Sequence, residues 1–284
     1  MVNILVTGAN GQLGSELKAL SNAYPYTFFF TSKDQLDITD KHAVVDFIEK
    51  NTINAIINCA AYTAVDKAES EQERADKINH QAVKHLAIIA KERNIKLVHI
   101  STDYVFDGMN HKPYLETDGT NPQSVYGKTK RDGENALLHV KLPNSIIIRT
   151  SWVYSSHGTN FVKTMLRLGK ERERLGVIFD QVGTPTYARD LAQVILEILP
   201  NINNAQTEIY HYSNEGVTSW YDFAQEIMKM AKLTCKVSSI ETKEYPTPVK
   251  RPHYSLLNKS KIKKDFGILI PYWKDSLGEC LKKL

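Results

Sequence analysis

The segment Ile4-Leu5-Val6-Thr7-Gly8-Ala9-Asn10-Gly11-Gln12-Leu13-Gly14 decides the fold. Its apolar start is typical of a buried parallel strand, and G-x-x-G-x-x-G follows directly, at the head of a helical pattern. Without a Cβ, Gly8 can make a tight turn, Gly11 can let the backbone approach a pyrophosphate, and Gly14 permits close helix-strand contact. The N-terminus of the helix directs N–H groups and a positive dipole end at phosphates. The alternative is a glycine turn that serves packing only, but its context predicts a dinucleotide-binding unit.

Short apolar runs alternate with longer segments whose apolar residues recur at helical spacing. The expected strands are Val2–Thr7, Thr27–Thr31, Ala55–Ala60, Lys96–Ser101 and Ser145–Thr150. The expected helices between them are Gln12–Ser21, His42–Lys50, Glu71–Arg93 and Ser124–His139. Nearly continuous apolar strands are typical of a sheet that is buried on both faces. The alternation predicts an α/β fold of the Rossmann type, with a doubly wound parallel sheet.

The pattern becomes less regular after residue 150. Helices are expected at Asn160–Gly169, Ala188–Leu199 and Ser219–Met230, and a strand near Gly176–Phe179. Residues 201–284 contain several prolines and show only one clear helix. We therefore predict a smaller, loop-rich α/β substrate lobe made of residues 151–170 and 201–284. Residues 1–150 and 171–200 are assigned to the dinucleotide-binding domain.

Composition excludes several classes of protein. Apolar residues make up 42% and charged residues 24%, with a mean hydropathy of −0.35, which is ordinary for a soluble globular protein. A net charge of +4 does not imply a nucleic-acid partner. The three cysteines are far apart and lack disulfide or metal spacing, which favours a reducing compartment. There is no membrane-length apolar run and no basic, signal-like start, so we expect a cytoplasmic protein.

The residues that follow the second and third strands indicate which dinucleotide binds. NAD enzymes place an acidic residue at the end of the second strand, where it bonds the ribose 2′-hydroxyl. Here Thr31 is followed by Ser32 and Lys33, which favours NADPH, although nearby Asp34 keeps NADH open. The expected cofactor-binding residues are Gly8, Asn10, Gly11, Gln12, Leu13, Gly14, Ser32, Lys33, Asp37, Ile38, Ala60, Ala61, Tyr62, Thr63, Tyr126 and Lys130.

Tyr126 and Lys130 are the expected acid–base pair. A spacing of four residues puts a phenol and an ammonium on one face of a helix, and a nearby cation lowers the pKa of a phenol. Thr102 ends a strand, at the edge of the sheet where open α/β folds bind ligands, and its hydroxyl can bond a carbonyl that is being reduced. Together with the glycine turn, this pattern resembles the Ser/Thr, Tyr-x-x-x-Lys triad of short-chain dehydrogenase/reductases. The nine histidines form no ligand pair, His99 is expected at a strand end, and we predict no metal ligands.

Longer motifs make the resemblance more specific. They are Gly8–Gly14, Asn58–Glu69, Ser101–Gly108, Val125–Gly133, Arg149–Tyr154, Asn160–Leu166, Asp180–Thr186 and Arg251–Leu256. Together they resemble the dTDP-4-dehydrorhamnose reductase family, part of the extended short-chain dehydrogenase/reductase superfamily, nearly end to end. The runs STDYVFDG, RTSWVY and DQVGTPT, in this order, are the most specific.

The resemblance implies an NADPH-dependent reduction of the C4 ketone of dTDP-4-dehydro-L-rhamnose to dTDP-L-rhamnose. Tyr126 would protonate the C4 oxygen, and Lys130 would hold the nicotinamide ribose. The implied substrate-binding residues are Thr102, Asp103, Trp152, Asn160, Phe161 and Arg251. Some family members are magnesium-dependent dimers, and Glu16 matches one acidic position of that site. The Mg²⁺ requirement and the choice between monomer and homodimer stay open.

Two alternatives to this reductase remain. An epimerase or dehydratase on the same scaffold needs further acid–base residues, commonly an acidic pair, whereas Asp103 is followed by Tyr104. A non-catalytic, NADP-binding regulatory subunit, like the beta subunit of methionine adenosyltransferase, resembles the same family. The intact Thr102, Tyr126 and Lys130 favour the enzyme.

Overall fold

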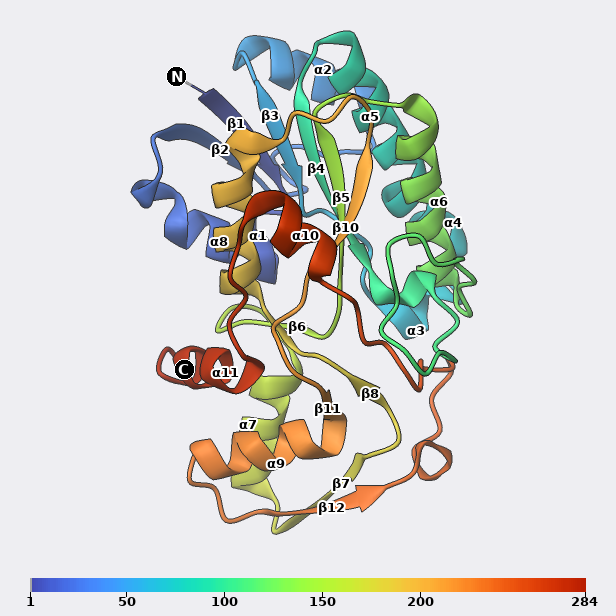
Figure 1. The fold of residues 1–284 in the computed structure, drawn as a ribbon, viewed down its shortest axis with the longest axis vertical. Coiled ribbons are helices and arrows are strands. Elements are labelled where there is room, and N and C mark those ends of the chain that lie inside the picture. The colour runs from blue at the N-terminus through green and yellow to red at the C-terminus, as the bar shows by residue number, and fades with distance from the viewer. Residues whose placement is uncertain (1) are drawn as a thin grey trace.

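The computed structural model describes residues 2–284, and its centre is a six-stranded sheet (Figure 1). The strands lie in the order β2-β1-β3-β4-β5-β10, and all of their pairings are parallel. Their bounds are β1 Val2–Thr7, β2 Tyr26–Thr31, β3 Ala55–Asn58, β4 Lys96–Thr102, β5 Ser145–Thr150 and β10 Glu208–His211. The predicted parallel sheet of the Rossmann type is confirmed.

The central strands are apolar because both of their faces are covered. Ile4 and Val6 pack into the hydrophobic cluster on one face of the sheet, while Leu5 packs into the cluster on the other face. The register also sets where strands end. β3 stops at Asn58, short of the predicted Ala60, because its partner Thr7 is the last residue of β1.

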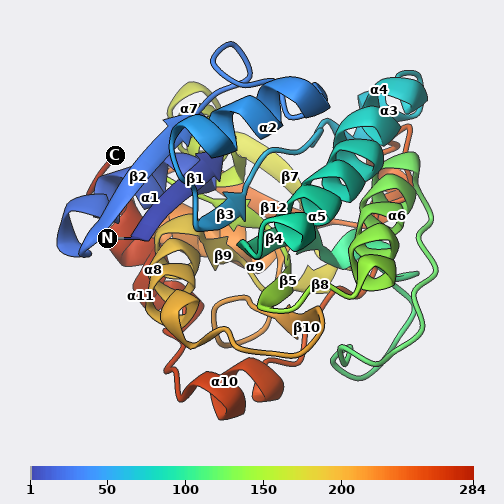
Figure 2. The same ribbon diagram turned by 90° about the horizontal axis from the view of Figure 1, so that it is seen from above.

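Two layers of helices cover the sheet, so the doubly wound arrangement is confirmed. One layer consists of α1 (Gln12–Leu20), α8 (Ala188–Ile198) and α10 (Ser260–Phe266). The other layer consists of α2 (Lys41–Lys50), α5 (Ala82–Glu92) and α6 (Val125–Val140). Figure 2 shows α5 and α6 on one side of the strands and α8 and α10 on the other. Apolar residues at helical spacing put one stripe of each helix against the sheet.

The helix predicted over Glu71–Arg93 has a different internal structure. It consists of α4 (Gln72–Asp76), a π-helical turn η2 (Lys77–Gln81) and α5. The π turn contains the buried Asn79, whose amide accepts a hydrogen bond from the backbone N–H of Tyr62 and donates one to the carbonyl of Tyr62. Tertiary hydrogen bonding at this turn therefore accompanies a local departure from regular helix, as π-bulges often show near sites.

A second group of elements, which we call the small lobe, lies below the sheet in Figure 1. Its strands are β6 (Val153–Tyr154), β7 (Arg174–Ile178), β8 (Val182–Gly183), β9 (Thr186–Tyr187), β11 (Thr218–Ser219) and β12 (Lys236–Ile240). Its helices are α7 (Phe161–Glu171), α9 (Trp220–Met230) and α11 (Trp273–Leu281). These helices share a hydrophobic cluster of their own with β7 and β12. The strands form three two-stranded pairs, β6-β9, β7-β12 and β8-β11.

Several elements lie outside the predicted lobe boundaries, among them β8 and β9, which pair with β11 and β6 of the small lobe. β10 was assigned to the substrate lobe, but it pairs with β5 as the edge strand of the main sheet. β7 was assigned to the sheet domain, but it pairs with β12 of the small lobe. Residues after 201 also form α10 and α11 beside the predicted α9. These short elements depend on partners far away in the chain, which local periodicity cannot detect.

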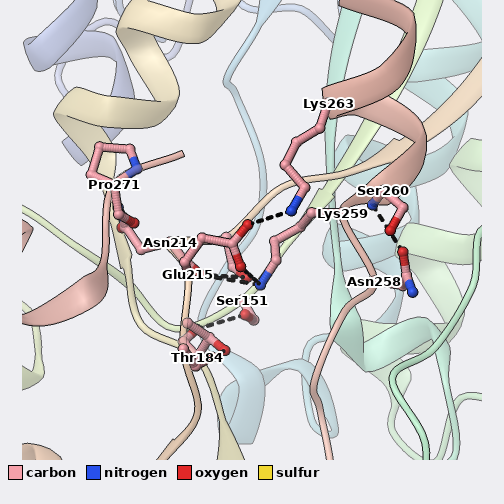
Figure 3. A network of polar contacts seen from close by, with 11 residues as sticks. Ser151, Thr184, Asn214, Glu215, Asn258, Lys259, Ser260, Lys263 and Pro271 are labelled. Carbon is pink, nitrogen blue, oxygen red and sulfur yellow. Dashed lines mark hydrogen bonds and ion pairs between the residues drawn. The ribbon is translucent and has the colours of Figure 1, made fainter. Parts of the chain in front are cut away.

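The segment that leads into α10 is tied to the rest of the molecule by a buried lysine (Figure 3). Lys259 Nζ donates to the carbonyl of Asn214 (3.2 Å) and lies 3.4 Å from Glu215 Oε2, while Lys263 Nζ donates to Glu215 Oε1 (2.7 Å). The Asn214 side chain donates to Asp190 of α8 and to Ser276 of α11. The sheet, the C-terminal helices and the small lobe therefore meet at one hydrogen-bonded junction.

The remaining elements are short. They are α3 (Val65–Ala68), η1 (Ser21–Ala23), η3 (Asp103–Val105), η4 (Leu199–Asn201) and η5 (Thr242–Glu244). Across residues 2–284, none of the helices combines the length and the apolar character needed to cross a membrane.

Candidate active site

A cleft of about 770 Å³ opens at the carboxyl ends of β1, β3 and β4. The helix after β1 covers one face of the sheet, and α5, after β3, covers the other, so the chain changes face between these adjacent strands. Such a switch point is where open α/β sheets bind ligands. Side chains of the small lobe complete the wall, including Trp152 and Val153.

The glycine turn forms one end of the cleft and has the geometry that a dinucleotide requires. Gly8 has φ +66°, and a Cβ there would lie 2.7 Å from the backbone nitrogen of Ala60. A Cβ on Gly14 would lie 2.6 Å from Ala9 Cα, so α1 can approach β1 only without one. Gly11 caps α1 without a side-chain hydrogen bond, which leaves the start of the helix open toward the cleft. This arrangement fits a bound pyrophosphate.

Three cations line the cleft beyond the end of β2. Lys33 was predicted, whereas Arg74 of α4 and Lys77 of the π turn were not. All three side chains are exposed. Lys33 and Lys77 lie near Asp37, and Arg74 pairs with Glu71 at 2.9 Å. Burial alone would raise the pKa of Asp37, but hydrogen bonds from Thr39 and the charges of Lys33 and Lys77 lower it overall. The sign of the charge at this end favours a phosphate.

Most of the predicted cofactor residues line the cleft. Those found there are Gly8, Gly11, Gln12, Leu13, Gly14, Lys33, Asp37, Ile38, Ala60, Ala61, Thr63, Tyr126 and Lys130. Asn10 is exposed and lies outside the lining. Ser32 also lies outside and donates to Gln35, and Tyr62 bonds Asn79 through its backbone. These three predicted residues therefore do not line the cleft.

The predicted catalytic residues meet at the other end of the cleft. Thr102 ends β4, while Tyr126 and Lys130 lie on the first turns of α6, whose N-cap Ser124 accepts from Gly127 N. Thr102 Oγ1 donates to Asp103 Oδ1 (3.0 Å), and the Tyr126 ring packs edge-on against Tyr104. The site therefore places a phenol, an ammonium and a hydroxyl in one cleft with the glycine turn.

The electrostatics of this pair differ from the expectation. Burial raises the pKa of Tyr126 to about 12, and a hydrogen bond with Thr102 opposes the rise. Lys130 is not among the groups that shift this pKa. Its Nζ donates to the carbonyl of Ile100 (2.6 Å) and lies 3.4 Å from His99 Nε2. Burial also lowers the pKa of Lys130 to about 8. The prediction that Lys130 depresses the pKa of Tyr126 is thus wrong for this arrangement.

Asp103 is the most unusual carboxyl group in the cleft. It is buried, and its Oδ2 has no hydrogen-bond partner among residues 2–284. Burial raises the pKa of Asp103 to about 7, although the hydrogen bond from Thr102 and the nearby Ser255 hydroxyl oppose the rise. A carboxyl group of this kind exists in both protonation states near neutral pH and can donate or accept a hydrogen bond.

The structure separates the predicted substrate residues into two groups. Thr102, Asp103 and Trp152 line the cleft, whereas Asn160, Phe161 and Arg251 do not. Their positions follow from packing. Asn160 caps α7 and donates to Gln12, Phe161 packs against Trp220, and Arg251 pairs with Asp66 at 2.7 Å. None of these last three lines the main cleft, and Arg251 lines a small separate pocket beside Tyr104.

Trp152 is positioned by a contact that the sequence did not indicate. Its indole stacks on that of Trp220, with ring centroids 3.6 Å apart and planes at 11°. Its backbone has φ +48°, a conformation that costs free energy in a non-glycine residue and is frequent at functional sites. Trp220 begins α9, and nothing in its local sequence marks it as a partner of a residue so far away.

Acidic residues do not assemble a metal site among residues 2–284. Glu16, the position matched to the family's magnesium site, is buried, accepts from Ser155 Oγ (2.7 Å) and lies 3.5 Å from Arg189 Nη1. No group of three potential metal-binding side chains was found around it or elsewhere in the described chain.

The fold and the site define a class: an NAD(P)-binding oxidoreductase of the short-chain dehydrogenase/reductase type. A family model described as "RmlD substrate binding domain" matches residues 2–284. A dTDP-4-dehydrorhamnose reductase of Aggregatibacter actinomycetemcomitans is 45% identical, over 98% of this chain and 97% of the relative. The chain therefore belongs to the dTDP-4-dehydrorhamnose reductase family.

Solved structures agree with this assignment. A dTDP-4-dehydrorhamnose reductase of Clostridium acetobutylicum has a TM-score of 0.94 at 44% identity, with 99% of each chain covered. The dTDP-4-dehydrorhamnose reductase of Bacillus anthracis, solved in complex with NADP, has a TM-score of 0.95 at 36% identity, with 100% of each chain covered. The likeness extends over both the sheet and the small lobe.

Proposed function

We propose that the protein reduces the C4 ketone of dTDP-4-dehydro-L-rhamnose to dTDP-L-rhamnose with NADPH. The observation that supports this most directly is the meeting of Thr102, Tyr126 and Lys130 in the same cleft as the glycine turn. The relatives named dTDP-4-dehydrorhamnose reductase support the choice of sugar. The free cysteines fit the expected reducing, cytoplasmic compartment.

Tyr126 is the proposed proton donor. Bound NADPH supplies the hydride, so the chain must supply only a proton and a polar environment for the ketone oxygen. A phenol with a pKa of about 12 is protonated at neutral pH, which is the state that a donor needs before reduction. Thr102 lies beside it and can orient the same oxygen. Lys130 would hold the nicotinamide ribose from the same cleft wall.

The preference for NADPH rests on charge at the other end of the cleft. Lys33, Arg74 and Lys77 present three cations, and no carboxylate ends β2. A 2′-phosphate gains from such cations, whereas NADH offers only a hydroxyl. The relative from Bacillus anthracis was solved with NADP. The charged Asp37 carboxylate accepts from Thr39 and lies near Lys33 and Lys77, which offset its charge.

The deciding experiment is oxidation of NADPH with dTDP-4-dehydro-L-rhamnose made in situ by upstream enzymes. Substrate-dependent oxidation with formation of dTDP-L-rhamnose supports the proposal, and NADPH should exceed NADH in kcat/KM. Binding of NADPH without turnover on any nucleotide sugar would sink the enzyme proposal in favour of a regulatory subunit. Equal kcat/KM for the two dinucleotides would overturn the role of the three cations.

A further inference from the structure

A line of buried polar side chains crosses the sheet beneath the cleft and ends at Lys130. The register pairs Thr7 of β1 with Asn58 of β3, and Asn58 with His99 of β4. Their side chains join through Thr7 Oγ1 to Asn58 Oδ1 (2.6 Å), and Asn58 Nδ2 to His99 Nδ1 (3.1 Å). His99 Nε2 then lies 3.4 Å from Lys130 Nζ. None of the four residues is more than 2% exposed.

This line is not the usual way to satisfy a buried histidine. Burying polar groups costs free energy unless each one is hydrogen-bonded, and neighbouring positions such as Val6 and Ile57 are apolar. His211, equally buried in β10, pairs with the backbone instead: its Nδ1 lies 3.1 Å from the carbonyl oxygen of Tyr114. His99 instead uses both ring nitrogens on side chains, and one of those side chains lines the cleft. The expectation that His99 is a strand-end residue was wrong.

The chemistry of the line allows it to respond to the charge of Lys130. An ammonium is only a donor, so it requires His99 Nε2 to accept, and the ring proton then sits on Nδ1. Asn58 accepts that proton with its amide oxygen only when the amide is turned by 180° from the orientation described above, and its NH2 group then donates to the Thr7 hydroxyl, which serves as donor or acceptor. The orientation in the structure, with Thr7 Oγ1 donating to Asn58 Oδ1 and Asn58 Nδ2 toward His99 Nδ1, suits a neutral amine. A charge-assisted bond is the stronger of the two, so the turned amide together with the ammonium is the favoured pair.

We propose that His99 is a positioning residue for Lys130. Asn58 and Thr7 hold its imidazole with Nε2 toward Lys130 Nζ, which fixes the ammonium at the wall of the cleft and keeps it charged. The carbonyl of Ile100 accepts from the same ammonium at 2.6 Å, so Nζ is held from two directions. The effect on turnover rests on the proposed reductase function, but the effect on Lys130 itself does not.

The other titratable groups around Lys130 do not replace His99. Burial lowers the pKa of Lys130 to about 8, and Glu134 on α6 and Cys59 after β3 oppose the drop. Glu134 is committed to Arg149 of β5, whose Nη2 lies 2.7 Å from Glu134 Oε2. His99 stays neutral because burial and the charge of Lys130 hold its pKa well below the ordinary value. Loss of this neutral acceptor should therefore lower the pKa of Lys130 further.

The test is a ¹³C NMR titration of lysine Cε in the full-length protein without added dinucleotide. The Lys130 signal is assigned by its absence in Lys130→Arg. His99→Met and His99→Gln are similar in size, but only glutamine can accept a bond from Nζ. We expect the Lys130 midpoint to fall by roughly one to two pH units in His99→Met, the equivalent of one charge-assisted hydrogen bond. In His99→Gln it should stay within about half a unit of the parent.

A control and an activity measurement complete the test. His211→Met makes the same replacement in the same sheet and should leave the Lys130 midpoint unchanged. In turnover assays, the alkaline limb of kcat/KM for NADPH should move to lower pH in His99→Met by as much as the NMR midpoint. An unchanged midpoint in folded His99→Met, or an equal shift in His211→Met, overturns the proposal.

Two further outcomes are separable. If His99→Met does not fold, Thr7→Val tests the proposal in its place. It removes the hydroxyl at the end of the line farthest from Lys130, with little change of side-chain volume. A lowered Lys130 midpoint in Thr7→Val supports the hydrogen-bonded line, and an unchanged midpoint overturns it. A lowered midpoint in a protein that reduces no nucleotide sugar would keep the positioning role and reject the proposed function.

Discussion

The two ends of the cleft are built in different ways. The dinucleotide end is one contiguous turn, Gly8–Gly14, whose backbone forms the binding surface. A Cβ at Gly8 or Gly14 would collide with the neighbouring backbone. The reaction end brings together side chains of β4 and α6, and burial shifts the pKa values of Asp103, Tyr126 and Lys130. Binding at the dinucleotide end therefore depends on the shape of the backbone, whereas chemistry at the reaction end depends on the protonation states of buried side chains.

The largest expected effect tests the reaction end alone. Tyr126→Phe removes the proposed proton donor and should lower kcat by about 10²–10⁴-fold, the usual contribution of a positioned acid. The dissociation constant for NADPH, measured by fluorescence titration, should be nearly unchanged. Tyr104→Phe is the matched control, since its ring packs against Tyr126 in the same cleft. An equal loss of kcat in the two variants would contradict the assignment of Tyr126.

The next effect concerns the cost of the buried carboxyl group. Asp103 has a pKa raised to about 7, so the folded protein binds its proton more tightly than the unfolded chain. Its stabilising contribution is present below pH about 4 and is lost as pH rises through about 7. Asp103→Asn should therefore gain stability relative to the parent across this range, by at most about 4 kcal/mol. Urea unfolding at several pH values measures this difference.

The opposite slope is expected for a nearby carboxylate. Hydrogen bonds from Met109 N and from the Tyr114 hydroxyl lower the pKa of Asp107. Its contribution is therefore present above the unfolded pKa and is lost as pH falls, so Asp107→Asn should lose stability near neutral pH and approach the parent in acid. If the stability difference from the parent changed with pH in the same direction in both variants, burial would not be raising the pKa of Asp103.

A smaller effect is expected at the dinucleotide end, where shape matters. Gly14→Ala places a Cβ against Ala9 Cα and should lower the free energy of unfolding by about 1–3 kcal/mol. NADPH binding should weaken as well. Gly278→Ala is the control, because its Cβ meets nothing within 4 Å. Alanine at this position of helix α11 should raise the free energy of unfolding by about 0.5–1 kcal/mol. A neutral Gly14→Ala would show that α1 can move away from β1.

The smallest effect concerns the wall that the small lobe adds to the cleft. Trp220→Ala removes the ring that stacks on Trp152, a contact worth about 0.5–1.5 kcal/mol beyond its buried area. We expect KM for the nucleotide sugar to rise by about 2- to 10-fold, with KM for NADPH unchanged. Tyr221→Ala changes the adjacent aromatic residue on α9 and should leave both constants alone. A rise in KM for NADPH alone would place Trp152 on the dinucleotide.

Sequence prediction was most accurate where the signal is local. The strands β1 to β5 and the glycine turn were predicted nearly to the residue, because apolar runs and glycine spacing reflect neighbouring positions. Arg74 and Lys77 were missed because they lie on a helix predicted as regular, and only the π turn and the cleft show which way they face. Arg251 was expected at the substrate, but an ion pair with Asp66 holds it outside the main cleft.

The sequence by itself determined the order of strands and helices and the glycine turn, and it singled out the proposed reacting groups, since each depends on residues a few positions apart. Only the tertiary structure decided that Lys130 bonds Ile100 and His99, with no lowering of the pKa of Tyr126. It alone paired β10 with β5 and Trp152 with Trp220. The physical reason is that burial, hydrogen-bond direction and pKa depend on which distant segments come together, and no local pattern encodes those neighbours.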